Sequence, residues 1–244
     1  MLLLSLFYHQ LFIETIYIKY IIDSMSVKSK YKARIIKPRY ILFDIARWSG
    51  WPFLLWYRIK KVYENKNQKK RIKGGALIVS NHILYSDVMV LSTAFWKRRL
   101  HYMVMKEIMA NKFLTWFYIH CGCIPVDREK PSYSSIREVT QLLEGGNVVT
   151  VFPEGHVTFK NENPRSSFKG GAVLMAYQAN VPIIPVYREV RKSVWHRQKV
   201  VVGEPINLRE KFGERMGMKE IEEATQYLFD KELELKALYH KEEK

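Results

Sequence analysis

The C-terminal two thirds of the chain alternate between short β-branched runs and segments in which apolar residues recur every three or four positions. The β-branched runs are bounded by turn residues and predict strands at 76–80, 101–105, 147–152, 182–187 and 198–203. The helical periodicity predicts helices at 87–95, 107–120, 133–144, 168–178 and 219–238. Strands and helices that alternate at this spacing indicate an α/β domain, with a mixed, largely parallel sheet flanked by helices.

The region before this domain has a different pattern. Residues 41–59 are mostly apolar and aromatic, and three of the six tryptophans, Trp48, Trp51 and Trp56, lie within nine residues. Pro52 should divide the segment into two short helices. Because indole rings favour the headgroup level of a bilayer, we predict a membrane-surface helical hairpin here. An amphipathic helix packed on the core is the alternative.

The charge of the chain is concentrated around this segment. The sequence has 40 Lys and Arg against 24 Asp and Glu, a net charge of +16. Fifteen of those cations and only two of the acids lie between Met25 and Lys73, so +13 falls in one fifth of the chain. Such asymmetry calls for an anionic partner. The basic block carries no RNP, helix-turn-helix or zinc-finger pattern, so we predict an anionic membrane surface and no nucleic acid.

The first 24 residues are apolar but are interrupted by Gln10, Glu14 and Lys19. No basic n-region precedes them and no small-residue cleavage site follows, which argues against a signal peptide. They are either a membrane anchor or a start-site artefact, with Met25 as the natural start. The chain therefore divides into an apolar N-terminal segment (1–24), a basic, Trp-rich membrane-association segment (25–73) and an α/β domain (74–244).

The two cysteines, Cys121 and Cys123, are separated by a single residue. A disulfide across so short a loop would be strained, and two thiols alone do not form a zinc site. We therefore predict reduced cysteines, no metal, and a membrane-associated protein that faces the cytoplasm.

The first predicted strand is followed by a histidine and an aspartate that can form a catalytic pair. His82 and Asp87 are five positions apart, or about 140° on an ideal helix, so they could not face each other there. They meet if His82 lies in the turn after the strand and Asp87 in the first turn of the next helix. The carboxylate then accepts from one ring nitrogen and leaves the other free as a base. Chance spacing is the alternative, in a chain with seven histidines.

Three further segments carry polar residues where a strand ends or a helix begins. Phe152-Pro-Glu-Gly155 closes an apolar strand, where the active-site loop of an α/β protein lies, although Pro-Glu-Gly is also a common turn. Residues 122–128 end in an Asp-Arg pair, which is read most simply as a surface ion pair. Lys169 precedes two glycines and a predicted helix, so it either holds an anion near the helix N-terminus or is a solvated lysine.

These segments, in this order, resemble the four sequence blocks of the glycerol-3-phosphate/1-acylglycerol-3-phosphate acyltransferase family. Asn81-His82-x4-Asp87 is similar to the NHxxxxD motif, and Gly122–Arg128 is similar to the second block. Phe152–Gly155 is similar to the FPEG block, and Val181-Pro-Ile-Ile-Pro185 to the fourth. The resemblance extends over residues 41–208 and is specific, because four motifs agree in order and spacing.

The resemblance implies that residues 74–244 are an O-acyltransferase domain. It implies transfer of a fatty acyl group from acyl-CoA or acyl-ACP to the free hydroxyl of 1-acyl-glycerol-3-phosphate, a lysophospholipid, with phosphatidic acid as product. His82 would be the general base, and Asp87 would orient its imidazole. Such a transfer requires no metal and no bound cofactor.

The same resemblance implies roles for five substrate-binding residues. Arg128 and Lys169 would bind the phosphate of the acceptor, a task that suits a guanidinium well. Glu154 and Gly155 would shape the acceptor pocket. Pro185 belongs to the block that lines the acyl or acceptor site.

One position departs from the family pattern. After FPEG the family commonly continues Thr-Arg-Ser, whereas this chain has His156-Val157-Thr158, so an expected phosphate ligand is absent. Either Lys160 or Arg165 supplies the charge from the following loop, or the acceptor is another lysolipid or a molecule without phosphate. A remote alternative is a non-catalytic basic protein that binds anionic lipid or nucleic acid.

Overall fold

The computed structural model describes residues 58–68, 71–109, 111–127, 133–154, 170–191, 193 and 195–241. The predicted helical hairpin lies almost entirely outside these ranges, within residues 1–57, and Arg128, Gly155 and Lys169 lie outside them too. The expectations for those positions stay predictions.

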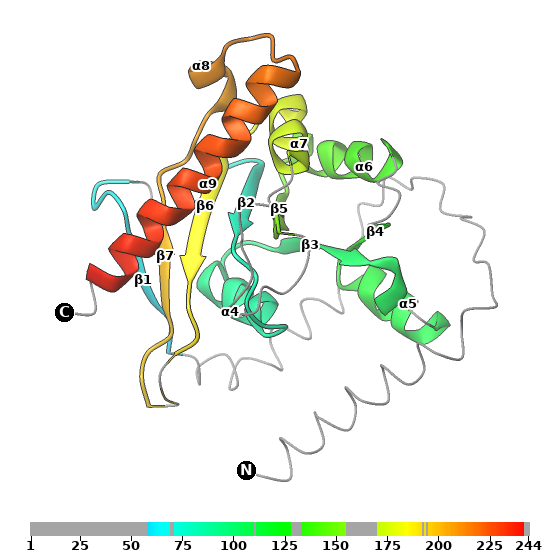
Figure 1. Cartoon of the computed structure of the whole chain (residues 1–244). Helices are drawn as coiled ribbons and strands as arrows, with labels where there is room; N and C mark the ends of the chain where they lie inside the picture. The colour runs from blue at the N-terminus through cyan, green and yellow to red at the C-terminus, as the bar shows by residue number, and fades with distance from the viewer. Residues whose placement is uncertain are drawn as a thin grey trace.

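The described residues fold around one seven-stranded sheet, in the strand order β1-β7-β6-β2-β5-β3-β4 (Figure 1). In chain order the strands are β1 (Lys60–Tyr63), β2 (Ala76–Ser80), β3 (Leu100–Met105), β4 (Ile124–Val126), β5 (Val148–Val151), β6 (Ile183–Arg188) and β7 (Lys199–Val202). All five predicted strands are present, and their ends lie within one residue of the prediction.

The sheet is mixed and largely parallel, as predicted. β2 pairs in parallel with β5 and β6, and β3 pairs in parallel with β5 and β4. β7 runs antiparallel to β6, and β1 joins β7 in parallel. The carboxyl ends of β2 to β6 therefore lie together at one edge of the sheet, which we call the carboxyl edge. The opposite edge is called the amino edge.

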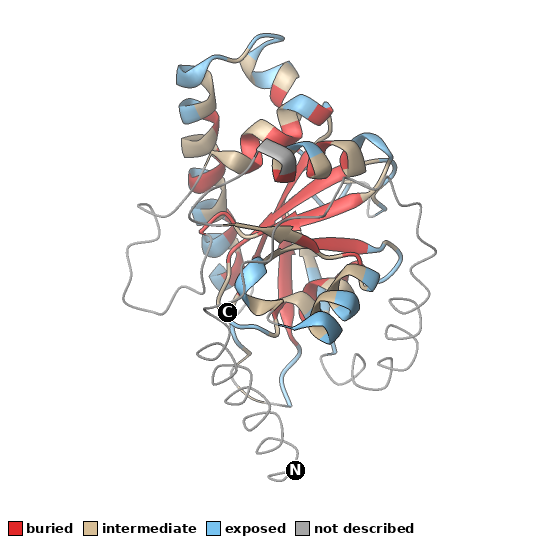
Figure 2. Cartoon of the chain, turned by 90° about the vertical axis from the view of Figure 1, so that its right-hand side faces the viewer, coloured by how far each residue is buried: buried red, intermediate tan, exposed pale blue. Residues whose placement is uncertain are grey.

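Helices cover both faces of the sheet, so the strands are buried between two layers (Figure 2). The helices are α4 (Asp87–Ala94), the 3-10 helix η1 (Lys106–Ile108), α5 (Lys112–His120), α6 (Tyr133–Glu144), α7 (Gly171–Ala179), α8 (Leu208–Phe212) and α9 (Met218–Lys241). Helices α6 to α9 share a core with Leu77 and Val79 of β2, whereas α4 packs with Ala76 and Ile78. Successive side chains of a strand point to opposite faces, which explains why β2 is apolar almost throughout.

Four elements differ from the sequence expectation, and one of them is α8, a short helix outside the predicted ranges. β1 is an edge strand that begins with the exposed Lys60 and Lys61, and it lies inside 25–73, so the sheet begins before the predicted boundary at residue 74. β4 is a three-residue strand that contains Pro125. The single helix predicted at 107–120 is wrong, because η1 ends at Ile108 and α5 begins anew with Asn111 as its N-cap. The Asn111 side chain accepts a hydrogen bond from the Leu114 amide at 2.8 Å.

Among the described helices, none is both long enough and apolar enough to cross a membrane.

Candidate active site

Three strands bring polar side chains to the carboxyl edge of the sheet. His82 follows β2, Glu154 follows β5, and Arg188 is the last residue of β6. Because these strands are parallel neighbours, their carboxyl ends meet where α/β proteins bind their ligands.

His82 and Asp87 form the predicted contact. Asp87 is the first residue of α4, and its buried Oδ2 lies 2.8 Å from His82 Nδ1. The same oxygen accepts hydrogen bonds from the backbone amides of Ile83 at 2.7 Å and Leu84 at 3.0 Å. These bonds fold the turn between β2 and α4 around the carboxylate. The turn thus brings together two side chains that an ideal helix would keep apart.

The other oxygen of Asp87 faces an arginine. Arg188 Nη2 lies 2.7 Å from Asp87 Oδ1, and the two side chains are 1% and 0% exposed. Because an uncompensated buried charge costs several kcal/mol, the guanidinium favours the ionised carboxylate. An ionised carboxylate can only accept hydrogen bonds, which assigns the proton to Nδ1 of His82 and leaves a lone pair on Nε2.

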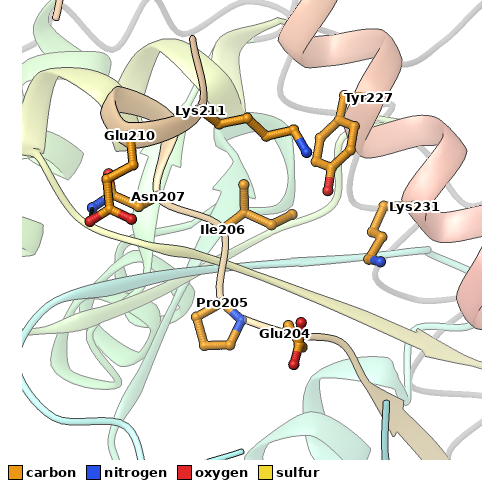
Figure 3. Close-up of a pocket in the computed structure, with 8 residues that line it drawn as sticks. All are labelled: Glu204, Pro205, Ile206, Asn207, Glu210, Lys211, Tyr227 and Lys231. Carbon is orange, nitrogen blue, oxygen red and sulfur yellow. Dashed lines mark hydrogen bonds between the residues drawn. The ribbon is translucent and has the colours of Figure 1, made fainter. Parts of the chain in front are cut away.

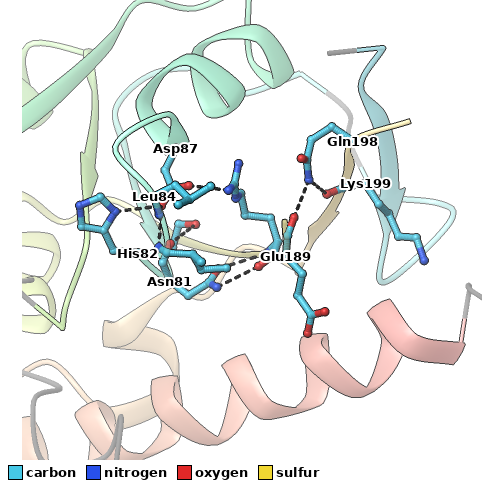
Figure 4. A network of polar contacts seen from close by, with 10 residues as sticks. Asn81, His82, Leu84, Asp87, Glu189, Gln198 and Lys199 are labelled. Atoms are coloured by element: carbon cyan, nitrogen blue, oxygen red, sulfur yellow. Dashed lines mark hydrogen bonds and ion pairs between the residues drawn. The ribbon is translucent and has the colours of Figure 1, made fainter. Parts of the chain in front are cut away.

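Asn81 connects this arginine to the strand that carries the histidine. Its Nδ2 donates to the Arg188 carbonyl at 2.9 Å, and its Oδ1 accepts from the Arg188 amide at 3.1 Å. Ser80 stands opposite Val186 in the β2–β6 register, so the Asn81 side chain extends the pairing beyond the end of β2. The four residues Asn81, His82, Asp87 and Arg188 form one continuous polar network, which we call the His–Asp–Arg network (Figure 4).

The imidazole is also held by stacking. The Phe152 ring, just after β5, lies 4.2 Å from the His82 ring with an interplanar angle of 17°. Tyr102 lies beyond Phe152, 6.5 Å from it, and its hydroxyl donates to the Val88 carbonyl at 2.9 Å. Burial raises the pKa of Tyr102, so its hydroxyl stays neutral. The His82 side chain remains 13% exposed, so a substrate can reach it.

Two other predicted site residues, Glu154 and Pro185, are described by the structure but do not contact His82 in the described hydrogen bonds and ring contacts. Glu154 is buried after β5, at the carboxyl edge. Pro185 is buried within β6, next to β7, where a Cβ added to Gly203 would come within 2.7 Å of Pro185 Cγ. This close approach gives Pro185 a packing role, and its part in substrate binding stays a prediction.

Sequence reasoning missed Arg188. The predicted strand ends at residue 187, and no local pattern links the arginine that follows to Asp87. A charged residue at the end of an otherwise apolar run is the signal that could have identified it, since such a side chain, once buried, needs an ionic partner.

Neither the cysteines nor the described acids and histidines form a second reactive centre. Burial raises the pKa of Cys123 to about 12 and also raises that of Cys121, so both thiols are neutral at physiological pH. Within the described ranges, no group of three His, Cys, Asp or Glu is arranged to hold a metal ion.

An open pocket lies at the amino edge (Figure 3). It is lined by Glu204, Pro205, Ile206, Asn207, Glu210, Lys211, Tyr227 and Lys231. Because β7 runs antiparallel to β6, the residues that follow β7 lie at the opposite edge from His82. The pocket shares no lining residue with the His–Asp–Arg network and is not a candidate active site.

Known acyltransferases resemble this chain in sequence. Residues 60–189 match the family model described as acyltransferase. The chain is 31% identical over 152 residues to a 1-acyl-sn-glycerol-3-phosphate acyltransferase of Bacillus subtilis, a match that covers 60% of this chain and 73% of the relative. It is 29% identical over 125 residues to a protein of the same name from Streptococcus pneumoniae, covering 51% of this chain and 45% of that protein.

The fold is also shared with a solved structure. The 1-acyl-sn-glycerophosphate (LPA) acyltransferase PlsC from Thermotoga maritima superposes with a TM-score of 0.54, at 19% identity, over 96% of this chain and 94% of that one. At this identity the likeness shows a common fold alone. The family match, however, spans more than half of this chain and includes every residue of the His–Asp–Arg network. The chain therefore belongs to the acyltransferase family and is an O-acyltransferase.

Proposed function

We propose that this enzyme transfers a fatty acyl group from a thioester to the free hydroxyl of 1-acyl-glycerol-3-phosphate and releases phosphatidic acid. The names of the sequence relatives support the acceptor. The observation that carries the chemistry is the geometry of His82, whose Nδ1 is bonded to the buried Asp87 and whose Nε2 is left with a lone pair.

In this mechanism His82 Nε2 removes the proton of the acceptor hydroxyl as that oxygen attacks the thioester carbonyl. A new C–O bond forms, and the tetrahedral intermediate then expels the thiolate as the C–S bond breaks. The leaving thiolate takes the proton back from His82, so the enzyme returns to its starting state. Asp87 stabilises the imidazolium in between, and no acyl-enzyme is needed.

The roles of the substrate-binding residues follow from the family resemblance. Arg128 and Lys169 bind the acceptor phosphate, and Glu154 and Gly155 shape the acceptor pocket. Pro185 belongs to the block that lines the acyl or acceptor site. The donor is acyl-CoA or acyl-ACP, and no cofactor stays bound. The basic, Trp-rich residues before the sheet hold the enzyme on anionic lipid at the cytoplasmic face of the membrane.

A second acceptor class is favoured by one observation. Val157 stands where the family commonly has an arginine, which removes a phosphate ligand. A different lysolipid, or an acceptor without phosphate, is therefore the alternative substrate.

The test is a transfer assay with purified protein, lysophosphatidic acid, a neutral lysolipid and a panel of acyl thioesters. We expect His82→Ala to reduce the rate of thiol release with the preferred acceptor by about 10²–10⁴-fold, as removal of a general base does. His120→Ala is the matched control, because His120 is exposed on α5 and its hydrogen bond among the described residues is to its own helix, at the Trp116 carbonyl. Equal rates for the wild type and His82→Ala would refute the mechanism, and a preference for the neutral lysolipid would select the second acceptor class.

A further inference from the structure

Arg188 is a buried cation that the proposed reaction does not use directly. Its side chain is 1% exposed and its guanidinium is paired with the fully buried Asp87. A buried ion pair is weak evidence for a stabilising role, because apolar residues of similar size often give equal or greater stability. The position of Arg188 at the end of β6, beside a catalytic carboxylate, therefore calls for an explanation beyond stability.

The carboxylate of Asp87 faces two side chains through two different oxygens. Oδ1 faces Arg188 Nη2 at 2.7 Å, and Oδ2 faces His82 Nδ1 at 2.8 Å. The backbone amides of Ile83 and Leu84 hold Oδ2, and the ion pair with Arg188 adds a second contact, at Oδ1, that opposes rotation of the carboxylate. The backbone of Arg188 is held by two hydrogen bonds with the side chain of Asn81, the residue that precedes His82. The backbone that carries Arg188 is therefore tied to the turn that carries the histidine.

We propose that Arg188 is a positioning residue for the reaction. By holding one oxygen of Asp87, it helps to keep the other directed at His82. This inference rests on the proposed role of His82. A carboxylate already shared with a guanidinium attracts the proton of an imidazolium less strongly than an isolated one, because a nearby positive charge disfavours the addition of another. Removing the charge of Arg188 should therefore strengthen the attraction of Asp87 for a protonated imidazole, which a pH profile can detect.

The other ionisable groups around this pair come from neighbouring strands. Tyr102 of β3 lies near Asp87, and its hydroxyl is neutral because burial raises its pKa. Glu154 follows β5, two residues beyond the Phe152 ring that stacks on His82. Glu189 is next to Arg188, but its carboxylate accepts from the Tyr187 hydroxyl at 2.8 Å and pairs with His240. Arg188 is thus the cation with a direct contact to Asp87 among the described contacts of this site.

The test measures the pH dependence of transfer for Arg188→Met and Arg188→Gln, which remove the charge, and for Arg188→Lys, which keeps it. For the two neutral variants we expect the acid limb of the rate profile to move to higher pH by about one unit or more. We expect kcat near neutral pH to fall by about tenfold or more while KM for donor and acceptor stays within roughly twofold. Arg188→Lys should leave the acid limb in place and restore part of kcat.

Arg98→Met is the matched control. Arg98 donates to the backbone carbonyls of Ile72, Gly74 and Gly146 at 3.0, 2.8 and 2.6 Å, so it is a structural arginine at the amino edge. We expect this variant to lower the unfolding temperature without moving the acid limb. If the neutral Arg188 variants also leave the limb in place, and lose activity only in proportion to stability, Arg188 is a structural residue and the proposal fails. Should Arg188→Met not fold, Arg188→Gln and Arg188→Lys give the same decision.

A second readout separates this inference from the proposed function. The His82 imidazole is titrated by NMR in the wild type and in Arg188→Gln, without substrate. We expect its titration midpoint to lie higher in the variant, even if turnover proves to depend on another residue. An unchanged midpoint overturns the inference on Arg188, whereas an unchanged rate in His82→Ala overturns the proposed function alone.

Discussion

The two edges of the sheet each hold a network of acidic and basic side chains, and the two networks differ in burial. At the carboxyl edge, Asp87 and Arg188 are almost wholly buried, and Asp87 contacts Nδ1 of His82. Figure 4 shows His82 beside Asp87. At the amino edge, Lys231 pairs with Glu64 at 2.6 Å and with Glu234 at 2.8 Å, in side chains that are 14%, 23% and 63% exposed.

Burial changes what such a network does. Exposed ion pairs contribute little to stability, typically 0–1 kcal/mol, because water already solvates each charge. A buried pair cannot lose one member without leaving the other uncompensated, which costs about 3–5 kcal/mol. The amino-edge network connects α9 to the residues after β1, and we expect it to tolerate substitution. We expect the buried carboxyl-edge network to tolerate it much less.

The largest loss of stability and activity should follow removal of the Asp87 carboxylate at the carboxyl edge. Asp87→Asn leaves Arg188 buried without a carboxylate and deprives the imidazolium of its counter-charge. We expect the free energy of unfolding to fall by about 3–5 kcal/mol and transfer to fall by about 10²–10⁴-fold. Urea denaturation followed by tryptophan fluorescence, together with the thiol-release assay, measures both effects.

Glu64→Gln is the matched change at the amino edge. Glu64 accepts from Lys231 and from the Glu204 amide at 2.9 Å, in a partly exposed setting. We expect a loss of stability of at most about 1 kcal/mol and no change in transfer rate. Full activity in Asp87→Asn would contradict the assignment of the carboxyl edge as the active site.

Glu232 on α9 offers an intermediate case, because it is a half-buried acid. Burial raises its pKa to about 7, and the charge of Lys236 only partly opposes this. The folded state then binds the proton more tightly than the unfolded chain, so stability from this group is present at low pH and is lost as pH rises from about 4.5 to about 7. Between pH 5 and pH 8 this group should lower the free energy of unfolding of the wild type by roughly 1–2 kcal/mol. We expect this decrease to be absent in Glu232→Gln.

The control for this titration is Glu222→Gln, an exposed position on the same helix. Urea midpoints at pH 5 and pH 8 are compared for the wild type and both variants, so that pH effects from other groups cancel. Equal pH dependence in the wild type and Glu232→Gln would show that water reaches this carboxylate freely.

The central, buried strands could be predicted from the sequence, whereas the outermost strand β1 and the boundary between η1 and α5 could not. β2 is apolar except for its last residue, Ser80, and lies between Gly75 and a polar turn, so composition and turn residues place it without tertiary information. β1 exposes two lysines and forms only because β7 offers a parallel partner far along the chain. The break between η1 and α5 depends on a side-chain cap at Asn111, which helical periodicity does not reveal.

The same distinction applies to the site. The contact of His82 with Asp87 is local. Because the two residues are five positions apart, the sequence alone shows that they can meet only if a turn precedes the start of the helix. Arg188 reaches Asp87 only because β6 is placed beside β2 in the sheet, and strand order is not written in any one segment. The pairing of β6 with β2 therefore adds Arg188 to the network, and no sequence motif indicates this contact.

The smallest expected effect is that of Lys231→Met, and it isolates burial as the cause of the difference between the edges. The substitution is the same in kind as Arg188→Met: a cation paired with a carboxylate becomes an apolar side chain of similar length. Water can solvate Glu64 and Glu234 once Lys231 is gone, so we expect stability within about 1 kcal/mol of wild type, unchanged kcat and an unmoved acid limb. Thermal unfolding and the pH profile of transfer measure these quantities. If Lys231→Met reduced transfer as strongly as Arg188→Met, loss of a paired cation elsewhere in the fold would be enough, and the special role of the buried network would have to be abandoned.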